Sequence, residues 1–191
     1  MSTDFTGFSE LEFKYKADNI SLLEFQTVMN SLVVSNRKDV SSWDHYYTNA
    51  VEDEFIRYRE SNEPELTIKR KVSKSNNWER IEVDLPIDGT KSEISIISKF
   101  VELLGYSNKK SIYKTCFIYW LEHINFVYYI VYDTNMVEKS RFIEVEFNKS
   151  QLPEHLDKVE SQLKYGQEVL AKLGLSPQNR LKKSLFEIFV K

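Results

Sequence analysis

The sequence has 191 residues, of which 41% are hydrophobic and 29% charged, and its formal net charge is −3. This composition is ordinary for a globular protein, and the length allows a sizeable hydrophobic core. The small negative net charge argues against a protein that coats nucleic acid through its overall charge. A single cysteine, Cys116, excludes an internal disulfide framework and fits a reducing compartment.

The sequence contains no segment that predicts export or membrane insertion. Residues 1–17 lack the basic, apolar and small-residue order of a signal peptide. The longest apolar run, around residues 124–132, is too short to span a bilayer and contains Asn125. We therefore expect a cytoplasmic protein with no membrane partner. We also expect one domain over residues 1–191, in which residues 150–191 form a C-terminal helical segment packed on the rest.

Alternation of charged and apolar residues predicts that much of the chain is β-strand. In residues 9–16, for example, Glu10, Glu12 and Lys14 alternate with Leu11 and Phe13. A period of two places these two sets on opposite faces of a strand. On this basis strands are expected over residues 9–16, 44–48, 55–60, 65–72, 78–85, 111–121, 126–133 and 141–148.

Apolar residues at helical spacing predict helices between these strands and after them. The expected helices cover about 20–33, 92–104 and 152–173, with a short one near 180–189. We expect Asp18 or Asn19 to cap the first helix, and Gly105 and Gly174 to end the second and third.

The helices must bury their apolar stripes against the apolar faces of the strands, so the charged faces point away from the helices. Closing the sheet removes its edges and turns the charged faces inward. Unpaired buried charge is very costly, but this inward set contains both signs. The sequence therefore predicts an α+β fold, an eight-stranded closed antiparallel β-barrel with helices packed on the outside. The inward charges would be Glu10, Glu12, Glu82, Asp84, Glu144 and Glu146 against Lys14, Arg57, Arg59, Lys69, Lys71 and Arg80.

A lumen with these charges suits a polyphosphate bound together with metal ions. Clustered carboxylates are hard oxygen ligands for Mg²⁺ or Mn²⁺, which bridge to substrate phosphates. Arginine grips phosphate oxygens bidentately, and lysine adds a point charge. Together they would neutralise charge that develops during attack on a phosphoryl group.

The ordered motifs resemble the CYTH superfamily, also called the triphosphate tunnel metalloenzymes. Residues 10–14 match its ExExK motif on the first strand, and residues 142–146 resemble its closing F-x-E-x-E strand. Further similar segments, in chain order, are Asp44–Tyr47, Phe55–Arg59, Leu66–Lys69, Arg80–Glu82 and the tail beginning Lys183–Ser184. The resemblance covers nearly the whole chain and implies an eight-stranded tunnel that binds a triphosphate.

The resemblance also implies roles for individual residues and a cofactor, Mg²⁺ or Mn²⁺. The implied metal ligands are Glu10, Glu12, Asp133, Glu144 and Glu146. The implied triphosphate-binding residues are Lys14, Arg57, Arg59, Lys69, Lys71, Arg80 and Lys114. The implied catalytic residues are Asp133, Glu10, Glu12 and Lys14.

Two positions depart from the pattern of this family. A later strand usually carries K-x-R, whereas here Lys114 is followed two residues later by Cys116. One phosphate contact is therefore missing, which can change the choice of substrate. The glycine that usually precedes F-x-E-x-E is also absent, and residues 136–140 take its place.

The leading hypothesis is a metal-dependent enzyme that hydrolyses ATP, another nucleoside triphosphate, thiamine triphosphate or inorganic triphosphate. The first alternative is a class IV-type adenylyl cyclase, which would make cyclic AMP and pyrophosphate on the same scaffold. An RNA 5′-triphosphate end is a further possible substrate, although the acidic balance supplies no obvious surface for RNA. The remaining alternative is a protein that binds a nucleotide or polyphosphate without turnover. The sequence allows a monomer or a homodimer.

Overall fold

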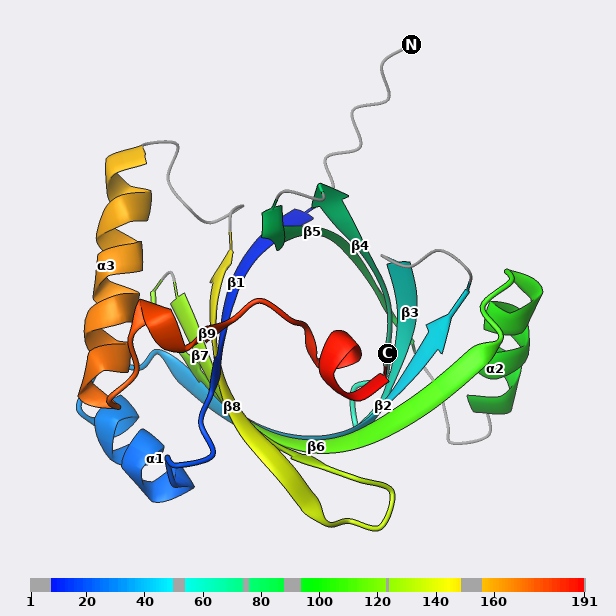
Figure 1. Cartoon of the computed structure of the whole chain (residues 1–191), viewed down its shortest axis with the longest axis horizontal. Helices are drawn as coiled ribbons and strands as arrows, with labels where there is room; N and C mark the ends of the chain where they lie inside the picture. Colours follow the sequence, from blue (N-terminus) through cyan, green and yellow to red (C-terminus); the bar gives the residue numbers. More distant parts are fainter. Residues whose placement is uncertain are drawn as a thin grey trace.

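The computed structural model describes residues 8–49, 54–73, 76–87, 94–122, 124–148 and 156–190. A nine-stranded antiparallel sheet curves into a ring, and α-helices lie on its outer side (Figure 1). The strands are β1 (Phe8–Lys16), β2 (Asn36–Thr48), β3 (Glu54–Glu60), β4 (Glu65–Ser73), β5 (Asn76–Pro86), β6 (Asn108–Trp120), β7 (Ile124–Tyr132), β8 (Glu138–Asn148) and β9 (Arg180–Leu181). The helices are α1 (Leu22–Asn30), α2 (Ile94–Leu103) and α3 (Leu156–Lys172), followed by the short 3₁₀-helix η2 (Pro177–Asn179) and the short π-helix η3 (Phe186–Val190).

The strand order confirms the predicted α+β fold but not a closed eight-stranded barrel. The order is β5-β4-β3-β2-β6-β7-β8-β1-β9, with an additional antiparallel pairing of β1 with β5. That pairing covers Phe8–Leu11 against Glu79–Glu82, about half of β1. Farther along β1, at Lys14 and Tyr15, the ninth strand β9 pairs instead. The ends of the sheet therefore meet over part of their length only.

Helices α1 and α3 cover one side of the ring, over the outer faces of β6, β7 and β8 (Figure 1). On β8, Ile143, Val145 and Phe147 are buried in this core, while the residues between them face the other way. Phe25 and Met29 of α1 are fully buried in the same core. Burying one such side chain contributes about 1.5–3 kcal/mol, so the apolar half of the alternation fixes which face of β8 points inward.

Helix α2 covers the opposite side of the ring, where Ile97 and Val101 pack on Tyr47, Ile56 and Tyr58. It ends at Gly105, whose φ of +90° is the left-handed conformation that favours glycine. The predicted C-terminal glycines are thus confirmed, since Gly174 after α3 also has a positive φ. Within the described residues, no helix is both long enough and apolar enough to cross a membrane.

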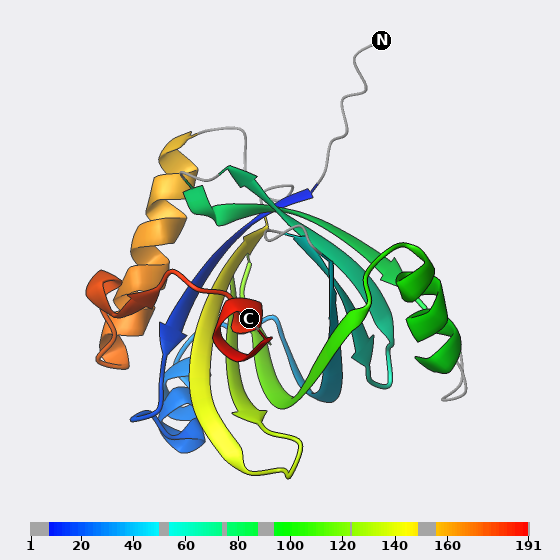
Figure 2. The same cartoon turned by 45° about the vertical axis from the view of Figure 1, so that its right-hand side comes forward.

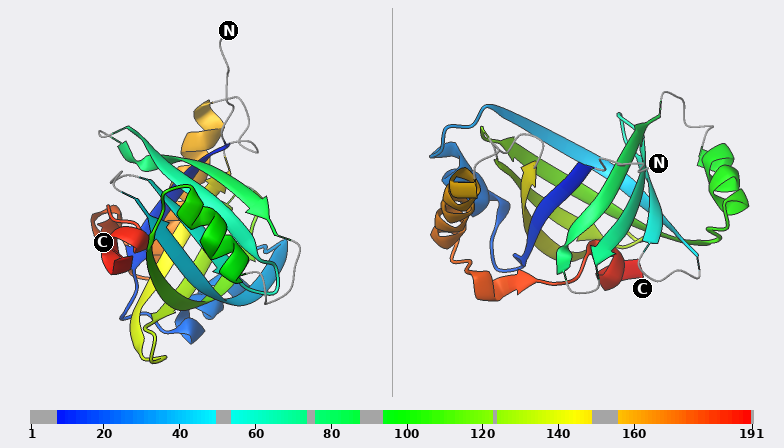
Figure 3. Two further views of the ribbon diagram at one scale, coloured as in Figure 1. Left: turned by 90° about the vertical axis from the view of Figure 1, so that its right-hand side faces the viewer. Right: turned by 90° about the horizontal axis from the view of Figure 1, so that it is seen from above.

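Two helix predictions were wrong in detail. Helix α1 is shorter than predicted and begins after Ser21, whose side chain and Glu24 form a capping box. Asp18, predicted as a cap, instead accepts hydrogen bonds from the Ser140 hydroxyl and the Arg141 backbone N–H. The predicted short helix near 180–189 is confirmed only in its second half, where the short helix η3 crosses one end of the ring (Figures 2 and 3). In its first half, Arg180–Leu181 form the strand β9.

Candidate functional site

The inner face of the sheet lines a cavity of about 750 Å³. Its charged lining comes from strands on all sides of the ring, because the residues at alternate strand positions point inward. These charged residues are Glu12, Lys14, Lys38, Asp39, Arg57, Arg59, Glu63, Glu65, Lys69, Asp84, Lys114, Glu144 and Glu146. Both signs are present, as the sequence predicts for an enclosed charged lumen.

The acidic cluster, as we call Glu12, Glu144 and the Lys14 between them, lies where β1 pairs with β8. The Lys14 ammonium lies 2.7 Å from an oxygen of Glu12 and 2.7 Å from an oxygen of Glu144. Burial would lower the pKa of Lys14, but the two carboxylates outweigh burial and raise it. Burial and the neighbouring charge of Glu12 raise the pKa of Glu144. One ammonium does not compensate two carboxylates, so this cluster keeps an excess negative charge.

The basic cluster consists of Asp44 on β2, Arg59 on β3 and Lys114 on β6. Asp44 is fully buried, with Arg59 Nε at 3.1 Å from one carboxylate oxygen and Lys114 Nζ at 2.7 Å from the other. Burial would raise the pKa of Asp44, but the charges of Lys114 and Arg59 hold it well below its usual range. Arg59 Nη1 also lies 3.7 Å from Glu65, which Arg57 contacts as well. The three cations Arg57, Arg59 and Lys114 thus face two carboxylates, Asp44 and Glu65, which leaves an excess of positive side chains.

Tyr129 of β7 lies between the two clusters. Its hydroxyl donates a hydrogen bond of 2.8 Å to Glu144, and the ammonium of Lys114 lies 5.8 Å from the centre of its ring. Burial raises the pKa of Tyr129 well above its ordinary value, so the hydroxyl keeps its proton and remains a donor. The acidic and basic clusters are therefore neighbours across a single side chain.

A second arginine in the cavity is held by its own partners. Arg57 donates to Glu65 at 3.0 Å and to the hydroxyl of Thr67 at 2.8 Å. Thr67, which is fully buried, donates in turn to Asp84 at 2.7 Å. This chain of bonds fixes the guanidinium on the wall of the cavity formed by β3, β4 and β5.

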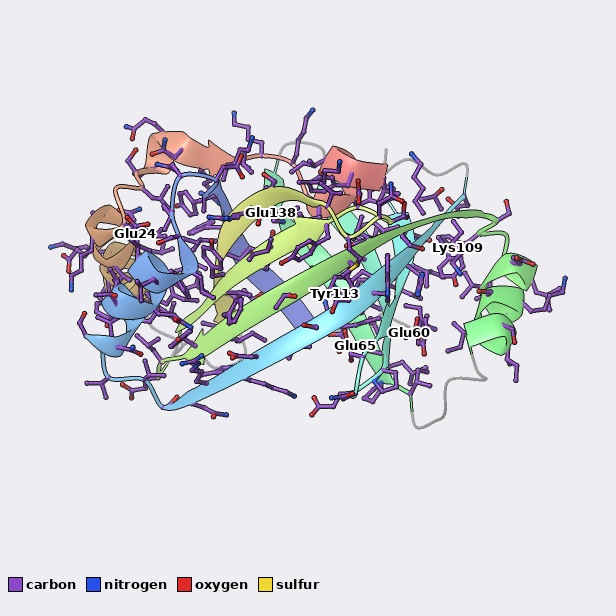
Figure 4. The ribbon with its side chains drawn as sticks, turned by 90° about the horizontal axis from the view of Figure 1, so that it is seen from below. Glu24, Glu60, Glu65, Lys109, Tyr113 and Glu138 are labelled. Carbon is purple, nitrogen blue, oxygen red and sulfur yellow. The ribbon has the colours of Figure 1, made fainter. Side chains whose placement is uncertain are left out.

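The two ends of the cavity differ in character. At one end, Leu185 and Phe186 of the C-terminal segment line the cavity, and the Phe186 ring stacks on Phe55 at 4.6 Å. At the other end, the lining includes the turn 61–64 between β3 and β4. Glu60 and Glu65, on either side of this turn, lie close together in Figure 4. This turn is polar, with Ser61, Asn62 and Glu63 among the residues that line the cavity.

The acidic cluster has donors that suit a hard divalent cation. Its ligands are carboxylate oxygens on neighbouring strands, and they already bind one cationic group, the Lys14 ammonium. In the part of the chain that the structure describes, no three Asp, Glu, His or Cys side chains converge as a metal-binding group. Mg²⁺ is commonly held by one or two carboxylates plus substrate phosphates, so two converging carboxylates fit that ion.

Asp133 is the one described residue of the predicted site that does not line the cavity. It lies in the turn between β7 and β8, where one carboxylate oxygen accepts from the backbone N–H groups of Asn135 and Val137. The other oxygen pairs with Lys139 at 2.8 Å, which together with these hydrogen bonds lowers the pKa of Asp133. Its contacts explain the turn and place it apart from the acidic cluster.

The remaining predicted site residues divide into two groups. The structure brings Glu12, Lys14, Arg57, Arg59, Lys69, Lys114, Glu144 and Glu146 together around one cavity. The side chains of Glu10, Lys71 and Arg80 lie outside what the structure describes, as does that of Glu82, which was predicted only as an inward charge. Their backbones are placed: Glu10 pairs with Arg80 across β1 and β5, and Lys71 pairs with Arg80 across β4 and β5.

Sequence reasoning assigned no role to two residues that organise the site, Asp44 and Tyr129. Both lie on strands at inward positions, but their partners come from other strands that are distant in sequence. A signal was present for Asp44, because it opens the segment Asp44–Tyr47, which resembles a motif of the family. No local pattern distinguishes Tyr129 from its neighbours in the aromatic run of β7.

Solved structures share this fold at low sequence identity. PH1012 from Pyrococcus horikoshii OT3 is 19% identical, with a TM-score of 0.69 over 93% of this chain and 98% of that one. A candidate adenylate cyclase from Vibrio parahaemolyticus is 12% identical, with a TM-score of 0.64 over 97% and 99%. A chain of the Schizosaccharomyces pombe Mediator head module is 11% identical, with a TM-score of 0.65 over 85% and 94%.

At these sequence identities the similarities bear out the predicted resemblance for the fold alone. No known protein-family model matches the sequence, and no curated protein is similar to it. Because a Mediator subunit also has this fold, the fold by itself does not determine an activity. The activity therefore depends on the residues that line the cavity.

Proposed function

We propose that this protein is a divalent-metal-dependent enzyme that hydrolyses the phosphoanhydride of a triphosphate inside the cavity. The observation that carries the proposal is the juxtaposition, across Tyr129, of a cluster with excess negative charge and a cluster with excess positive charge. A metal–triphosphate complex presents a cation and an anion side by side. Each cluster therefore has a counterpart in that ligand.

The basic cluster would bind the phosphate oxygens. Arg59 is held by Asp44 through its Nε, and Lys114 is held through its ammonium, so neither side chain must be ordered on binding. Arg57, fixed by Glu65 and Thr67, adds a third cation to the same cavity. Positioned cations stabilise the charge that develops on a transferring phosphoryl group, and they do so best in a water-poor site.

Glu12 and Glu144 would hold Mg²⁺ or Mn²⁺, with Glu146 and Glu10 as further predicted ligands on the same two strands. When bound, the metal would neutralise phosphate charge and lower the pKa of a bound water. The task of the protein is to keep two carboxylates ionised next to each other. The ammonium of Lys14 and the hydroxyl of Tyr129, both bonded to Glu144, favour its charged form against burial and the charge of Glu12, which raise its pKa.

The direct test is release of orthophosphate and pyrophosphate from ATP, other nucleoside triphosphates, thiamine triphosphate and inorganic triphosphate with Mg²⁺ or Mn²⁺. We expect metal-dependent orthophosphate release that Glu144→Gln reduces by about a hundredfold or more. The matched control is Glu102→Gln, which removes an exposed carboxylate on α2, a helix on the outer side of the sheet. Wild-type turnover by Glu144→Gln would refute the site.

The products separate hydrolysis from the alternatives. Cyclic AMP with pyrophosphate, in place of orthophosphate, would show that the site acts as an adenylyl cyclase. Tight triphosphate binding without any product under either metal would show a binding protein. Both outcomes would overturn the proposed hydrolysis while leaving the triphosphate site in place.

A further inference from the structure

The lumen has an apolar wall as well as charged ones. Val40 of β2, Cys116 and Ile118 of β6, and Val127 of β7 all line the cavity. Val40 pairs with Cys116 across β2 and β6, and Ile118 pairs with Val127 across β6 and β7. These four side chains, which we call the apolar wall, therefore form one continuous patch on the inner face of the sheet.

The apolar wall adjoins both charged clusters. Cys116 pairs with Tyr129, whose hydroxyl bonds Glu144 of the acidic cluster. Cys116 is two residues from Lys114 of the basic cluster on the same strand, and Val127 pairs with Glu144 across β7 and β8. A ligand whose phosphates lie between the clusters would thus have its next atoms beside the apolar wall.

An apolar wall strengthens the binding only of triphosphates that carry an apolar surface. Inorganic triphosphate consists of charged oxygens throughout and gains nothing from apolar contact. An organic group gains about 25 cal/mol for each Å² of apolar surface that leaves water. The volume of the cavity, about 750 Å³, also lies within the range of about 300–1,000 Å³ typical of sites for small organic ligands.

We infer that the substrate is an organic triphosphate, whose non-phosphate group lies against the apolar wall, and not inorganic triphosphate. This inference rests on the proposed function and narrows its substrate class. Ile118 and Cys116 would be specificity-determining residues, because they meet the part of the substrate that distinguishes the two classes. An arginine in place of Cys116 would turn that part of the wall into a further phosphate contact.

The test compares kcat/KM for organic triphosphates (four nucleoside triphosphates and thiamine triphosphate) with kcat/KM for inorganic triphosphate, at equal Mn²⁺. We expect at least one organic triphosphate to be preferred by about tenfold or more. In Ile118→Thr, which keeps a β-branched side chain and adds a hydroxyl, that preference should fall by about tenfold.

The matched control is Ile130→Thr, the same substitution on β7, where Ile130 packs against the core on the outer side of the sheet. It should leave the ratio of the two kcat/KM values unchanged. A second variant, Cys116→Arg, should lower turnover of the organic triphosphate and raise that of inorganic triphosphate. Because each result is a ratio measured on one sample, partial loss of folded protein cancels.

The outcomes separate this inference from the proposed function. If the wild type turns over inorganic triphosphate at least as well as every organic one, the inference is wrong and the proposed hydrolysis stands. If no triphosphate is turned over, the proposed function is wrong. In that case the affinities of the same ligands for the wild type and for Ile118→Thr are measured by calorimetry. Equal affinities of the wild type for organic and inorganic triphosphate would overturn the inference.

Discussion

In the acidic cluster one ammonium lies between two carboxylates, whereas in the basic cluster one carboxylate lies between two cationic side chains. The two arrangements use the same kind of contact with opposite signs. In each cluster the central group pairs with both of its neighbours, which offsets the cost of burying them, and one sign of charge stays in excess. A lumen of this kind can therefore be stable without a ligand and still attract a metal ion to one place and phosphate to another.

The group at the centre of each cluster, Lys14 in the acidic cluster and Asp44 in the basic one, is expected to respond differently when the ligand binds. A metal ion would have to displace the Lys14 ammonium or bind beside it, because Lys14 contacts the two carboxylates best suited to that metal. Asp44 has no such competitor, since a triphosphate is an anion and would bind to Arg59 and Lys114 from the other side. The acidic cluster is therefore expected to rearrange on binding, and the basic cluster to stay fixed.

The largest effect is expected when the acidic cluster loses both carboxylate charges. In the double variant Glu12→Gln and Glu144→Gln, Mn²⁺ binding measured by calorimetry should disappear, and kcat/KM should fall by about 10²–10³ or more. The reason is that neutral amides are weak ligands and leave the charge of Lys14 uncompensated. Retention of wild-type Mn²⁺ affinity would show that the metal binds elsewhere.

Asp44→Asn should be the most destabilising change in the basic cluster. It leaves two buried cations without their counter-ion, so the free energy of unfolding in urea should fall by about 3 kcal/mol near neutral pH. The pKa of Asp44 in the fold lies below its ordinary value of 3.8. Its stabilising contribution is therefore present above that pH and is lost as the pH falls below it.

The pH dependence gives this prediction a control. The difference in unfolding free energy between wild type and Asp44→Asn should be largest near neutral pH and should shrink as the pH falls below about 3.8. A difference that is the same under both conditions would mean that Asp44 acts through packing and not through its charge.

Tyr129→Phe should have a smaller effect, which tests the link between the clusters. The variant loses one buried hydrogen bond to Glu144, worth about 1 kcal/mol of stability, and should also weaken Mn²⁺ binding. Tyr128→Phe is the matched control. Tyr128 donates a bond of the same length, 2.8 Å, to the backbone of Ile20 on the outer side of the sheet. It should lose similar stability with no change in Mn²⁺ affinity.

The smallest effect is expected for Asp133→Asn. Because Asp133 already bonds to groups of the turn between β7 and β8, turnover should stay within about twofold of wild type, with only a small loss of stability. Steady-state kinetics of the purified variant measures this. A loss as large as that of Glu144→Gln would place Asp133 in the site, as the family resemblance implies.

The sequence predicted the inward charges well because strand alternation is local. Glu144 and Glu146 could be placed on one face, and Ile143 and Val145 on the other, without knowing which strands pair. The first half of β2 was missed for the opposite reason. Residues 36–42 are polar except for Val40, so they show no alternation, and their pairing with β6, which is distant in sequence, makes them a strand.

The organisation of the site could be predicted less well than its composition. Which cation pairs with which carboxylate depends on contacts between strands far apart in the chain, such as Lys114 with Asp44. The short strand β9 has only two residues, so no periodicity reveals it. Its partner, β1, lies near the other end of the sequence. Asp133 was assigned by resemblance alone, and the local pattern gave no sign of its role in a turn.

The central claim is that the two clusters bind the two halves of one ligand, and mutual enhancement of binding tests it most directly. Mn²⁺ affinity is measured by calorimetry with and without a saturating non-hydrolysable ATP analogue, after correction for the metal–nucleotide complex in solution. We predict that the analogue tightens Mn²⁺ binding by about tenfold or more, and that Mn²⁺ tightens analogue binding by the same factor, as linkage requires. Equal Mn²⁺ affinity with and without the analogue would contradict the account.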